Sequence, residues 1–303
     1  MTYTEISKAA GERLSQLCGM ALFDAAKSCV NPETIPGVSE EDVIVQIYEE
    51  LEPEELYYFA EATTANQTDV IELIEARIRN GFTTGGAKID LTEVPIWSDY
   101  TDKSRNIRYK IHSWLMIDGF LNADQVTDND KYLQMASNIA LDWVQRFVIN
   151  MESDEFAWYD MAVGQRATKL AYILRRLVET KADPKDIFKL IIAVEIHMIE
   201  LSQLERIATH SNHGLFQLAG LYALSKSLKI MNKSTTSSEF GEEILSKMLT
   251  EHFATDGLHL EHSPDYHLYM VNLLNSFVKS NWINDSVVLN EMISTVEEAA
   301  TWM

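Results

Sequence analysis

The feature that most constrains this chain is a helical period that runs almost without interruption from about residue 105 to residue 303. Within Pro184–Ala208, apolar side chains recur at the i, i+3, i+4 and i+7 spacing of a helix with one buried face: Ile187, Leu190, Ile191, Val194, Met198 and Leu201. No alternating strand pattern competes with this stripe. The chain also has only 12 Gly and 6 Pro, too few for the many turns of a β protein. The sequence therefore predicts an all-α fold.

Sequential helices joined by short connections pack as antiparallel neighbours. Eight in a row suit layered helical hairpins, a superhelix or a toroid better than one four-helix bundle. No fixed-period repeat supports a helical solenoid. The expected helices are Arg108–Phe120, Asn129–Met151, Asp160–Thr180, Pro184–Ala208, His213–Met231, Glu239–Phe253, Pro264–Ser280 and Asp285–Met303.

Residues 1–104 form an acidic helical region that we expect to belong to the same fold as residues 105–303. Its first 60 residues contain three basic and twelve acidic side chains, which indicates a solvated helical face. Acidic starts and the Asn80-Gly81 stop mark the helix ends. The expected helices are Glu5–Val30, Glu40–Glu50, Glu54–Ala62 and Asp69–Arg79.

The helical period disappears over residues 81–104, which predicts a long loop. This segment holds three Gly, one Pro and an apparently exposed Trp97. Loops of this length are usually either functional or disordered. At its end, Lys103–Lys110 contains four basic residues and no acidic one. This stretch is either a local positive rim or a solvated helix start.

The overall charge excludes some classes of partner. The chain has 25 Lys and Arg against 46 Asp and Glu, a net charge of −21 at pH 7. Such a field repels phosphate backbones and anionic lipid, so we expect neither a nucleic-acid partner nor a membrane partner. An anionic substrate must instead meet a local positive site. No run of eighteen apolar residues and no export signal is visible, which predicts a cytoplasmic protein.

The two cysteines, Cys18 and Cys29, lie eleven residues apart in one amphipathic stretch. This spacing is typical of neither a disulfide framework nor a zinc site. We expect both to be buried thiols.

The first candidate site segment is residues 208–224, ATHSNHGLFQLAGLYAL. Ser211 or Asn212 can cap a helix that begins near His213. Helix N-termini attract anions, and the amide of Asn212 and the ring of His213 add directional donors. The alternative is a plain helix cap beside a surface histidine.

The second segment is residues 256–274, DGLHLEHSPDYHLYMVNLL. Ser263 at the N-cap and Pro264 at the first helical position specify a helix start and place Tyr266 in its first turn. A phenol there can carry a proton, or it can be a packing aromatic. His259, His262, His267 and Glu261 could in principle ligate zinc, but their spacing matches no familiar pattern. We therefore expect no metal, and the absence of nucleotide-binding motifs predicts no other cofactor.

The third segment is residues 156–174, FAWYDMAVGQRATKLAYIL. Trp158 and Tyr159 precede a helix that starts at Asp160, and Arg166 lies two turns into that helix. Aromatic rings beside an arginine make a platform for a sugar ring and a carboxylate. The alternative is a core-facing aromatic pair with a surface arginine.

Together, these segments resemble a known family. The motifs W-Y-D-M-A-x-G-x-R (158–166), N-H-G-x-x-Q-x-x-G-L (212–221) and D-G-x-H-x-E-H-S-P-x-Y-H (256–267) are similar to those of heparinase II/III-like polysaccharide lyases, which include oligoalginate lyases. The likeness is good over residues 105–303 and looser before them. It implies an incomplete (α/α) toroid of antiparallel helical hairpins with a cleft across its mouth.

The resemblance also implies a reaction, the β-elimination of a bond beside a uronic acid in an acidic polysaccharide or oligosaccharide. It gives Asn212 and His213 the role of holding the carboxylate and stabilising the enolate-like intermediate. Tyr266 would move protons. The substrate-positioning candidates are Trp158, Tyr159, Arg166, His262 and His267.

Members of the family usually continue into a C-terminal β-sandwich, whereas this sequence stops at EEAATWM. We therefore expect either a fragment of a longer lyase or a short version whose helices have another use. The alternative function is a non-catalytic glycan-binding or assembly module on the same helices. Glycoside hydrolysis is a third, for which Asp160 and Glu261 are only nominal carboxylates. Because helices of one layer of a toroid run in the same direction, we expect Asn212, His213 and Tyr266 to converge on one cleft.

Overall fold

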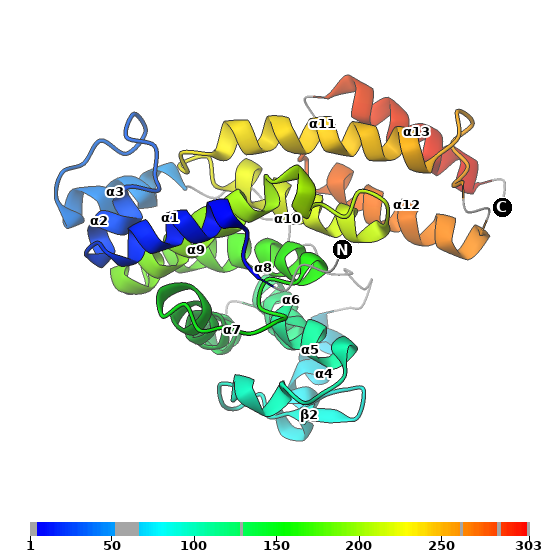
Figure 1. Cartoon of the computed structure of the whole chain (residues 1–303). Coiled ribbons are helices and arrows are strands. Elements are labelled where there is room, and N and C mark those ends of the chain that lie inside the picture. Colours follow the sequence, from blue (N-terminus) through cyan, green and yellow to red (C-terminus); the bar gives the residue numbers. More distant parts are fainter. Residues whose placement is uncertain (1–4, 52–66, 128–129, 261–262, 284–285, 302–303) are drawn as a thin grey trace.

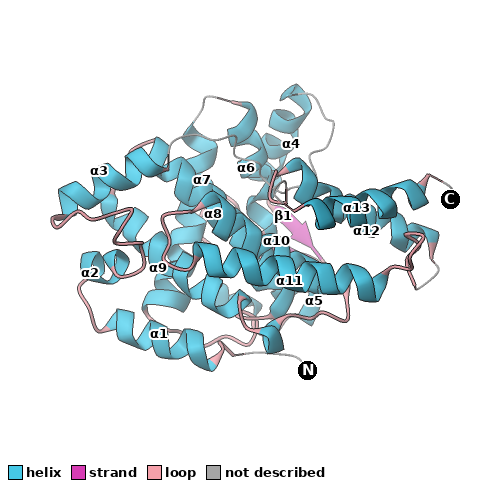
Figure 2. Cartoon of the chain, turned by 90° about the horizontal axis from the view of Figure 1, so that it is seen from above, coloured by secondary structure: helices cyan, strands magenta, loops and turns pink. Residues whose placement is uncertain are grey.

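The computed structural model describes residues 5–51, 67–127, 130–260, 263–283 and 286–301. These residues form thirteen α-helices and one small β-hairpin, which confirms the prediction of an all-α fold (Figures 1 and 2). The helices are α1 (Lys8–Cys18), α2 (Leu22–Lys27), α3 (Glu40–Glu50), α4 (Gln67–Asn80), α5 (Arg105–His112), α6 (Asp118–Val126), α7 (Asp130–Val144), α8 (Asp160–Glu179), α9 (Pro184–Leu201), α10 (Asn212–Ser227), α11 (Ser234–His252), α12 (Pro264–Lys279) and α13 (Val287–Ala300).

Local capping chemistry fixes several helix ends where the sequence predicts them. Helix α3 begins in a capping box, in which Ser39 and Asp42 each bond the other's backbone N–H. Helix α4 ends before Gly81, whose φ of 78° is the left-handed conformation that glycine adopts readily. Helix α12 begins with the Ser263 hydroxyl accepting from the Tyr266 N–H and Pro264 in the first turn. The predicted helix Glu54–Ala62 lies outside the described residues.

Two predicted helices are each split in two, which corrects the sequence-based boundaries. The segment Glu5–Val30 divides at Gly19, which ends α1 before α2 begins. The segment Arg108–Phe120 divides at Trp114, whose backbone is left-handed (φ 58°) and whose side chain is completely buried. The Trp114 ring packs edge-on against Trp143 at 5.6 Å. This tertiary contact outweighs the local preference for a continuous helix, so the apolar period cannot reveal the break.

Part of the predicted loop at 81–104 is ordered by a hairpin. Strands β1 (Phe82–Thr84) and β2 (Ala87–Ile89) pair antiparallel across a Gly85-Gly86 turn in which both glycines have positive φ. Trp97 is buried with 4% of its surface exposed, which corrects the prediction that it is exposed. Its indole N–H donates to an Asp142 carboxylate oxygen at 2.6 Å. This bond anchors the end of the segment to α7.

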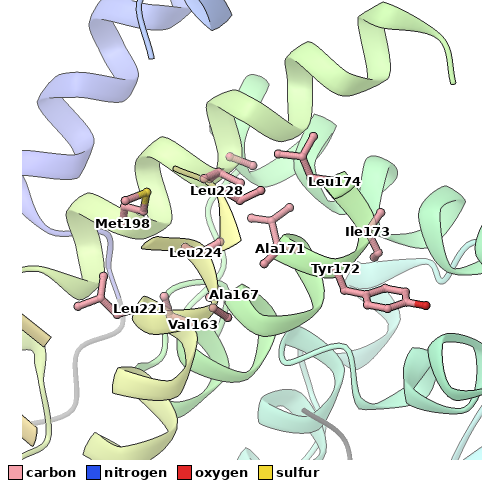
Figure 3. Packing of buried hydrophobic residues seen from close by; sticks show 14 of the residues in the cluster. Val163, Ala167, Ala171, Tyr172, Ile173, Leu174, Met198, Leu221, Leu224 and Leu228 are labelled. Carbon is pink, nitrogen blue, oxygen red and sulfur yellow. The ribbon is translucent and has the colours of Figure 1, made fainter. Parts of the chain in front are cut away.

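Helices α8, α9 and α10 form the centre of the molecule, and the other helices pack around them (Figure 1). Helices α1 and α2 lie on α9, α3 contacts α8, and α4 lies on α6. Helix α11 packs on α10, and α13 lies beside both α11 and α12. Figure 3 shows apolar residues of α8 and α10 in one layer of the core, including Val163, Ala167, Leu221 and Leu224. The acidic N-terminal helices therefore share the core of the rest of the chain.

The two cysteines differ in exposure. Cys29 is buried as predicted, whereas Cys18 is exposed, which corrects that part of the prediction. Burial raises the pKa of the Cys29 thiol to about 12. Among the helices that the structure describes, none is both long and apolar enough to cross a lipid bilayer.

Candidate functional site

Helices α8 and α10 run parallel at a very short separation, which sets the geometry of the site. An added Cβ at Gly164 would lie under 3.0 Å from the backbone of Phe216, and one at Gly220 would lie equally close to the backbone of Gly164. Contacting residues of the two helices are separated by a nearly constant distance in sequence. Asp160 contacts His213, 53 residues later, and Arg175 donates to the carbonyl of Ser227, 52 residues later. The N-termini of α8 and α10 therefore lie at the same end of the molecule.

The start of α10 faces the start of α8 through a polar contact. His213 Nδ1 lies 3.3 Å from an Asp160 carboxylate oxygen, and the His213 side chain is 33% exposed against 11% for Asp160. Burial raises the pKa of Asp160, but hydrogen bonds from His213 and from the Met161 N–H outweigh burial and bring it below its ordinary value. Asp160 is thus an ionised partner that fixes the orientation of His213.

Tyr159 joins this pair to α5. Its hydroxyl accepts a 2.8 Å hydrogen bond from Arg105. Burial and the Asp160 charge raise the pKa of Tyr159. The Tyr159 ring is buried and packs edge-on to His213 with 6.5 Å between ring centroids. Tyr159 therefore lies beside His213, with its hydroxyl held by Arg105.

Asn212 is the first residue of α10 and is half-buried. Ser211 occupies the position before the helix, but no side chain caps the start of α10, which corrects the predicted capping role. The Ser211 hydroxyl instead points back to the Ala208 carbonyl at 3.5 Å. Asn212 thus lies beside His213 at the positive end of the α10 dipole.

A series of aromatic contacts connects Tyr266 with the segment before α10. The Tyr266 ring packs on His259 at 4.9 Å, and His259 packs on His252 at 6.0 Å. His252 Nε2 in turn lies 2.6 Å from the Thr209 carbonyl. Farther along both helices, Tyr222 of α10 packs on Phe277 of α12 at 5.6 Å. Helices α10 and α12 therefore begin at the same end of the molecule, whereas a cleft shared by Asn212 and Tyr266 stays a prediction.

Arg166 lies in the core, contrary to the prediction that it contacts substrate. It is 0% exposed and donates to His197 Nε2 at 2.9 Å and to the backbone carbonyls of His112 and Ala157. Burial lowers its pKa, and the Trp143 ring lies 3.8 Å from its guanidinium carbon. A buried side chain with these partners braces α8 against the preceding loop and cannot meet a glycan at the surface.

The other predicted substrate residues are also placed differently from expectation. Trp158 is buried beside Trp143 and His197, so it does not offer a sugar-stacking face. His267 is completely buried, accepts from the His259 N–H at Nδ1 and donates from Nε2 to the Val296 carbonyl. Both are packing residues in this structure, because both rings are covered and the ring nitrogens of His267 are bonded internally.

The candidate metal ligands of the second segment include Glu261 and His262. Glu261 and His262 lie outside the described residues. Within the described part of the chain, no group of three or more His, Cys, Asp or Glu side chains is placed to hold a metal ion.

The sequence did not single out two features of this site. Arg105 and Tyr109 lie one turn apart on α5 and both contact Tyr159. The only sequence signal for Arg105 was the basic stretch Lys103–Lys110, which does not say which of its four cations faces the site. Gly164 and Gly220 lie within the motifs given above, but a glycine in a helix does not indicate which other helix packs closely against it.

Replacing Arg166 by Met should destabilise the fold rather than weaken substrate binding. The change leaves His197 Nε2 and two buried carbonyls without their donor, so we expect the free energy of unfolding to fall by about 3 kcal/mol. Urea unfolding followed by tryptophan fluorescence measures this change. Arg79→Met, at an exposed position near the end of α4, should change stability by less than about 0.5 kcal/mol. If Arg166→Met instead raised KM and left the stability unchanged, Arg166 would be a substrate contact as the sequence predicted.

Comparison with known proteins agrees with this architecture. The family described as Heparinase II/III N-terminus matches residues 64–302. A heparan sulfate lyase HepC mutant from Pedobacter heparinus superposes with a TM-score of 0.66 at 15% identity, over 99% of this chain and 47% of that one. A heparinase III, the BT4657 gene product with methylated lysines, superposes with a TM-score of 0.68 at 15% identity, over 90% and 48%.

These likenesses confirm the predicted fold, an incomplete (α/α) toroid. The chain spans about half the length of these solved structures. No curated protein matches the sequence. Because the family match extends over most of the residues, this chain belongs to the heparinase II/III N-terminal domain family.

Proposed function

We propose that this chain is the helical part of a polysaccharide lyase that cleaves a uronate-containing glycan by β-elimination. The proposal is supported by membership of the heparinase II/III family and by similarity in fold to heparan sulfate lyases. The observation that carries it is the pairing of His213 with Asp160 beside Asn212, at the end of the molecule where α8, α10 and α12 begin.

Elimination beside a uronate requires the carboxylate charge to be neutralised before the C5 proton can leave. The Asn212 amide, the His213 ring and the positive end of the α10 dipole supply donors for that carboxylate. Asp160 holds His213 Nδ1, which leaves Nε2 to face a ligand. These groups stabilise the negative charge that moves onto the carboxylate when the C5–H bond breaks.

Tyr266 is the proposed proton carrier. Its oxygen takes the C5 proton, and a proton returns to the 4-O atom as the C4–O bond breaks and the C4–C5 double bond forms. The atoms of this step balance without a cofactor or a water molecule, because the proton lost from C5 balances the proton that the 4-O leaving group gains. The position of Tyr266 in the first turn of α12, on the ring of His259, supports this assignment.

The test is the ultraviolet absorbance of the new conjugated double bond during incubation with alginate, heparan sulfate or hyaluronan. We expect absorbance to rise with at least one of these polymers, because hydrolysis gives no such chromophore. The assay should use the 303-residue chain and the complete product of its natural gene. Binding without absorbance by the complete product would contradict the lyase proposal and favour a glycan-binding module. Hydrolysed products without absorbance would favour a glycosidase.

A further inference from the structure

Arg105 is an exposed arginine of this acidic chain that contacts no carboxylate among the described residues. Arg108, one turn further along α5, pairs with Asp154 and Glu155, and Arg176 of α8 pairs with Asp124 and Glu179. Within the described residues, the bonded partner of Arg105 is the neutral hydroxyl of Tyr159 at 2.8 Å. In a chain with 46 acidic side chains, an exposed guanidinium held on a phenol is unusual.

The guanidinium of Arg105 is oriented by aromatic side chains. Its central carbon lies 5.1 Å from the centroid of the Tyr159 ring, and that ring packs edge-on to Tyr109 at 6.0 Å. Tyr109 is itself fixed, because its hydroxyl donates to Gln165 at 2.8 Å. One of the five N–H donors of Arg105 is engaged by Tyr159, so the exposed side of the fork can still bind an oxyanion through two parallel hydrogen bonds.

Arg105 is connected to the proposed carboxylate site through Tyr159. Arg105 donates to the Tyr159 hydroxyl, the Tyr159 ring packs edge-on to His213, and His213 Nδ1 contacts Asp160, the next residue after Tyr159. The Arg105 guanidinium carbon and the His213 ring lie 5.1 Å and 6.5 Å from the centroid of the same Tyr159 ring, so the sum of these two distances is the upper limit of their separation. This separation suits two acidic groups on one oligosaccharide, one at each position.

We propose that Arg105 is a specificity-determining residue that binds a second oxyanion of the glycan, a carboxylate or a sulfate, while the first carboxylate is held by Asn212 and His213. This inference rests on the proposed function. It predicts that the chain prefers substrates with an additional acidic group to substrates that carry a single uronate. Tyr159 positions the fork by accepting one of its hydrogen bonds.

The test measures the affinity of the 303-residue chain and of Arg105→Gln by calorimetry. The ligands are an alginate trisaccharide with adjacent uronates, a sulfated heparan tetrasaccharide, and an unsulfated disaccharide with one uronate. Arg105→Gln should lose about tenfold or more in affinity for ligands with a second oxyanion, and less than about twofold for the single-uronate ligand. Loss with the alginate trisaccharide assigns a carboxylate, and loss with the sulfated ligand alone assigns a sulfate.

Two further variants separate this role from a general charge effect or a structural one. Lys103→Gln removes the same charge two residues away, from a lysine that pairs with Asp102, and should leave all three affinities unchanged. Arg105→Lys keeps the charge but not the fork, and should recover only part of the lost affinity.

The possible failures are distinguishable. If Arg105→Gln binds every ligand as tightly as the parent chain, or loses affinity equally for all three, the second-oxyanion site is wrong while the proposed function stands. If the parent chain and the complete gene product bind none of the acidic ligands, the proposed function fails and this inference fails with it.

Discussion

Replacing Asn212 by Ala should lower kcat on a uronate-containing glycan by about 10²–10³-fold, because it removes a donor from the developing enolate. Asn212 is the first residue of α10 and no side chain caps that helix, so its loss should cost little stability. Steady-state kinetics of elimination and a thermal unfolding curve measure both quantities. We expect a large change in kcat, a small change in KM and an almost unchanged unfolding midpoint.

The matched control is Asn80→Ala, an exposed asparagine at the last position of α4. It should leave turnover unchanged. A purely structural Asn212 would give the opposite pattern, with about 1 kcal/mol of stability lost and turnover unaffected.

Tyr266→Phe should lower kcat at least as much as Asn212→Ala, because it removes the proton carrier while keeping the ring that packs on His259. Tyr100→Phe, outside the three motif segments, is its control and should leave kcat unchanged.

Replacing Gly164 by Ala should reduce the free energy of unfolding by about 3 kcal/mol, although alanine is the better helix former. The added methyl group would lie under 3.0 Å from the backbone of Phe216. Backbone atoms within a helix cannot move aside singly, so α8 and α10 must separate and the apolar layer between them must loosen. Chemical denaturation measures the loss of stability.

The same substitution should also lower activity, because separating α8 from α10 moves Asp160 away from His213. Gly11→Ala is the matched control, since the nearest atom to an added Cβ in α1 lies at an ordinary 3.5 Å. There we expect stability to be unchanged or raised by up to about 1 kcal/mol. A Gly164→Ala protein as stable as the parent would show that the helix crossing tolerates a wider separation.

The sequence by itself determined the fold class and the helix ends that have a capping signal, whereas α9 ends at Leu201 instead of Ala208 and α11 begins at Ser234 instead of Glu239. A sustained 3.6-residue period requires a buried face along each helix, and capping groups such as Ser39 and Ser263 act within one turn of the chain. Both signals come from residues close together in the chain, so they can be identified without knowing which helices pack against one another. The motif around Asn212 and His213 was equally visible, since its helix-terminal position follows from local sequence.

Only the tertiary structure decided which side chains face the site. Trp97, Trp158 and Arg166 look like surface or ligand-binding residues in sequence, yet each is buried with its polar atoms or its ring engaged by groups distant in the chain. An arginine can lie in a core only when carbonyls and aromatic rings replace its water, and those groups come from other helices.

The parallel register of α8 and α10 was likewise hidden in the sequence. It depends on Gly164 and Gly220 meeting across the interface, and the pairing of Asp160 with His213 over 53 residues follows from it. Periodicity states that a helix has a buried face but does not name the partner of that face. The partner is selected by close packing between whole helices, which is a property of the assembled core.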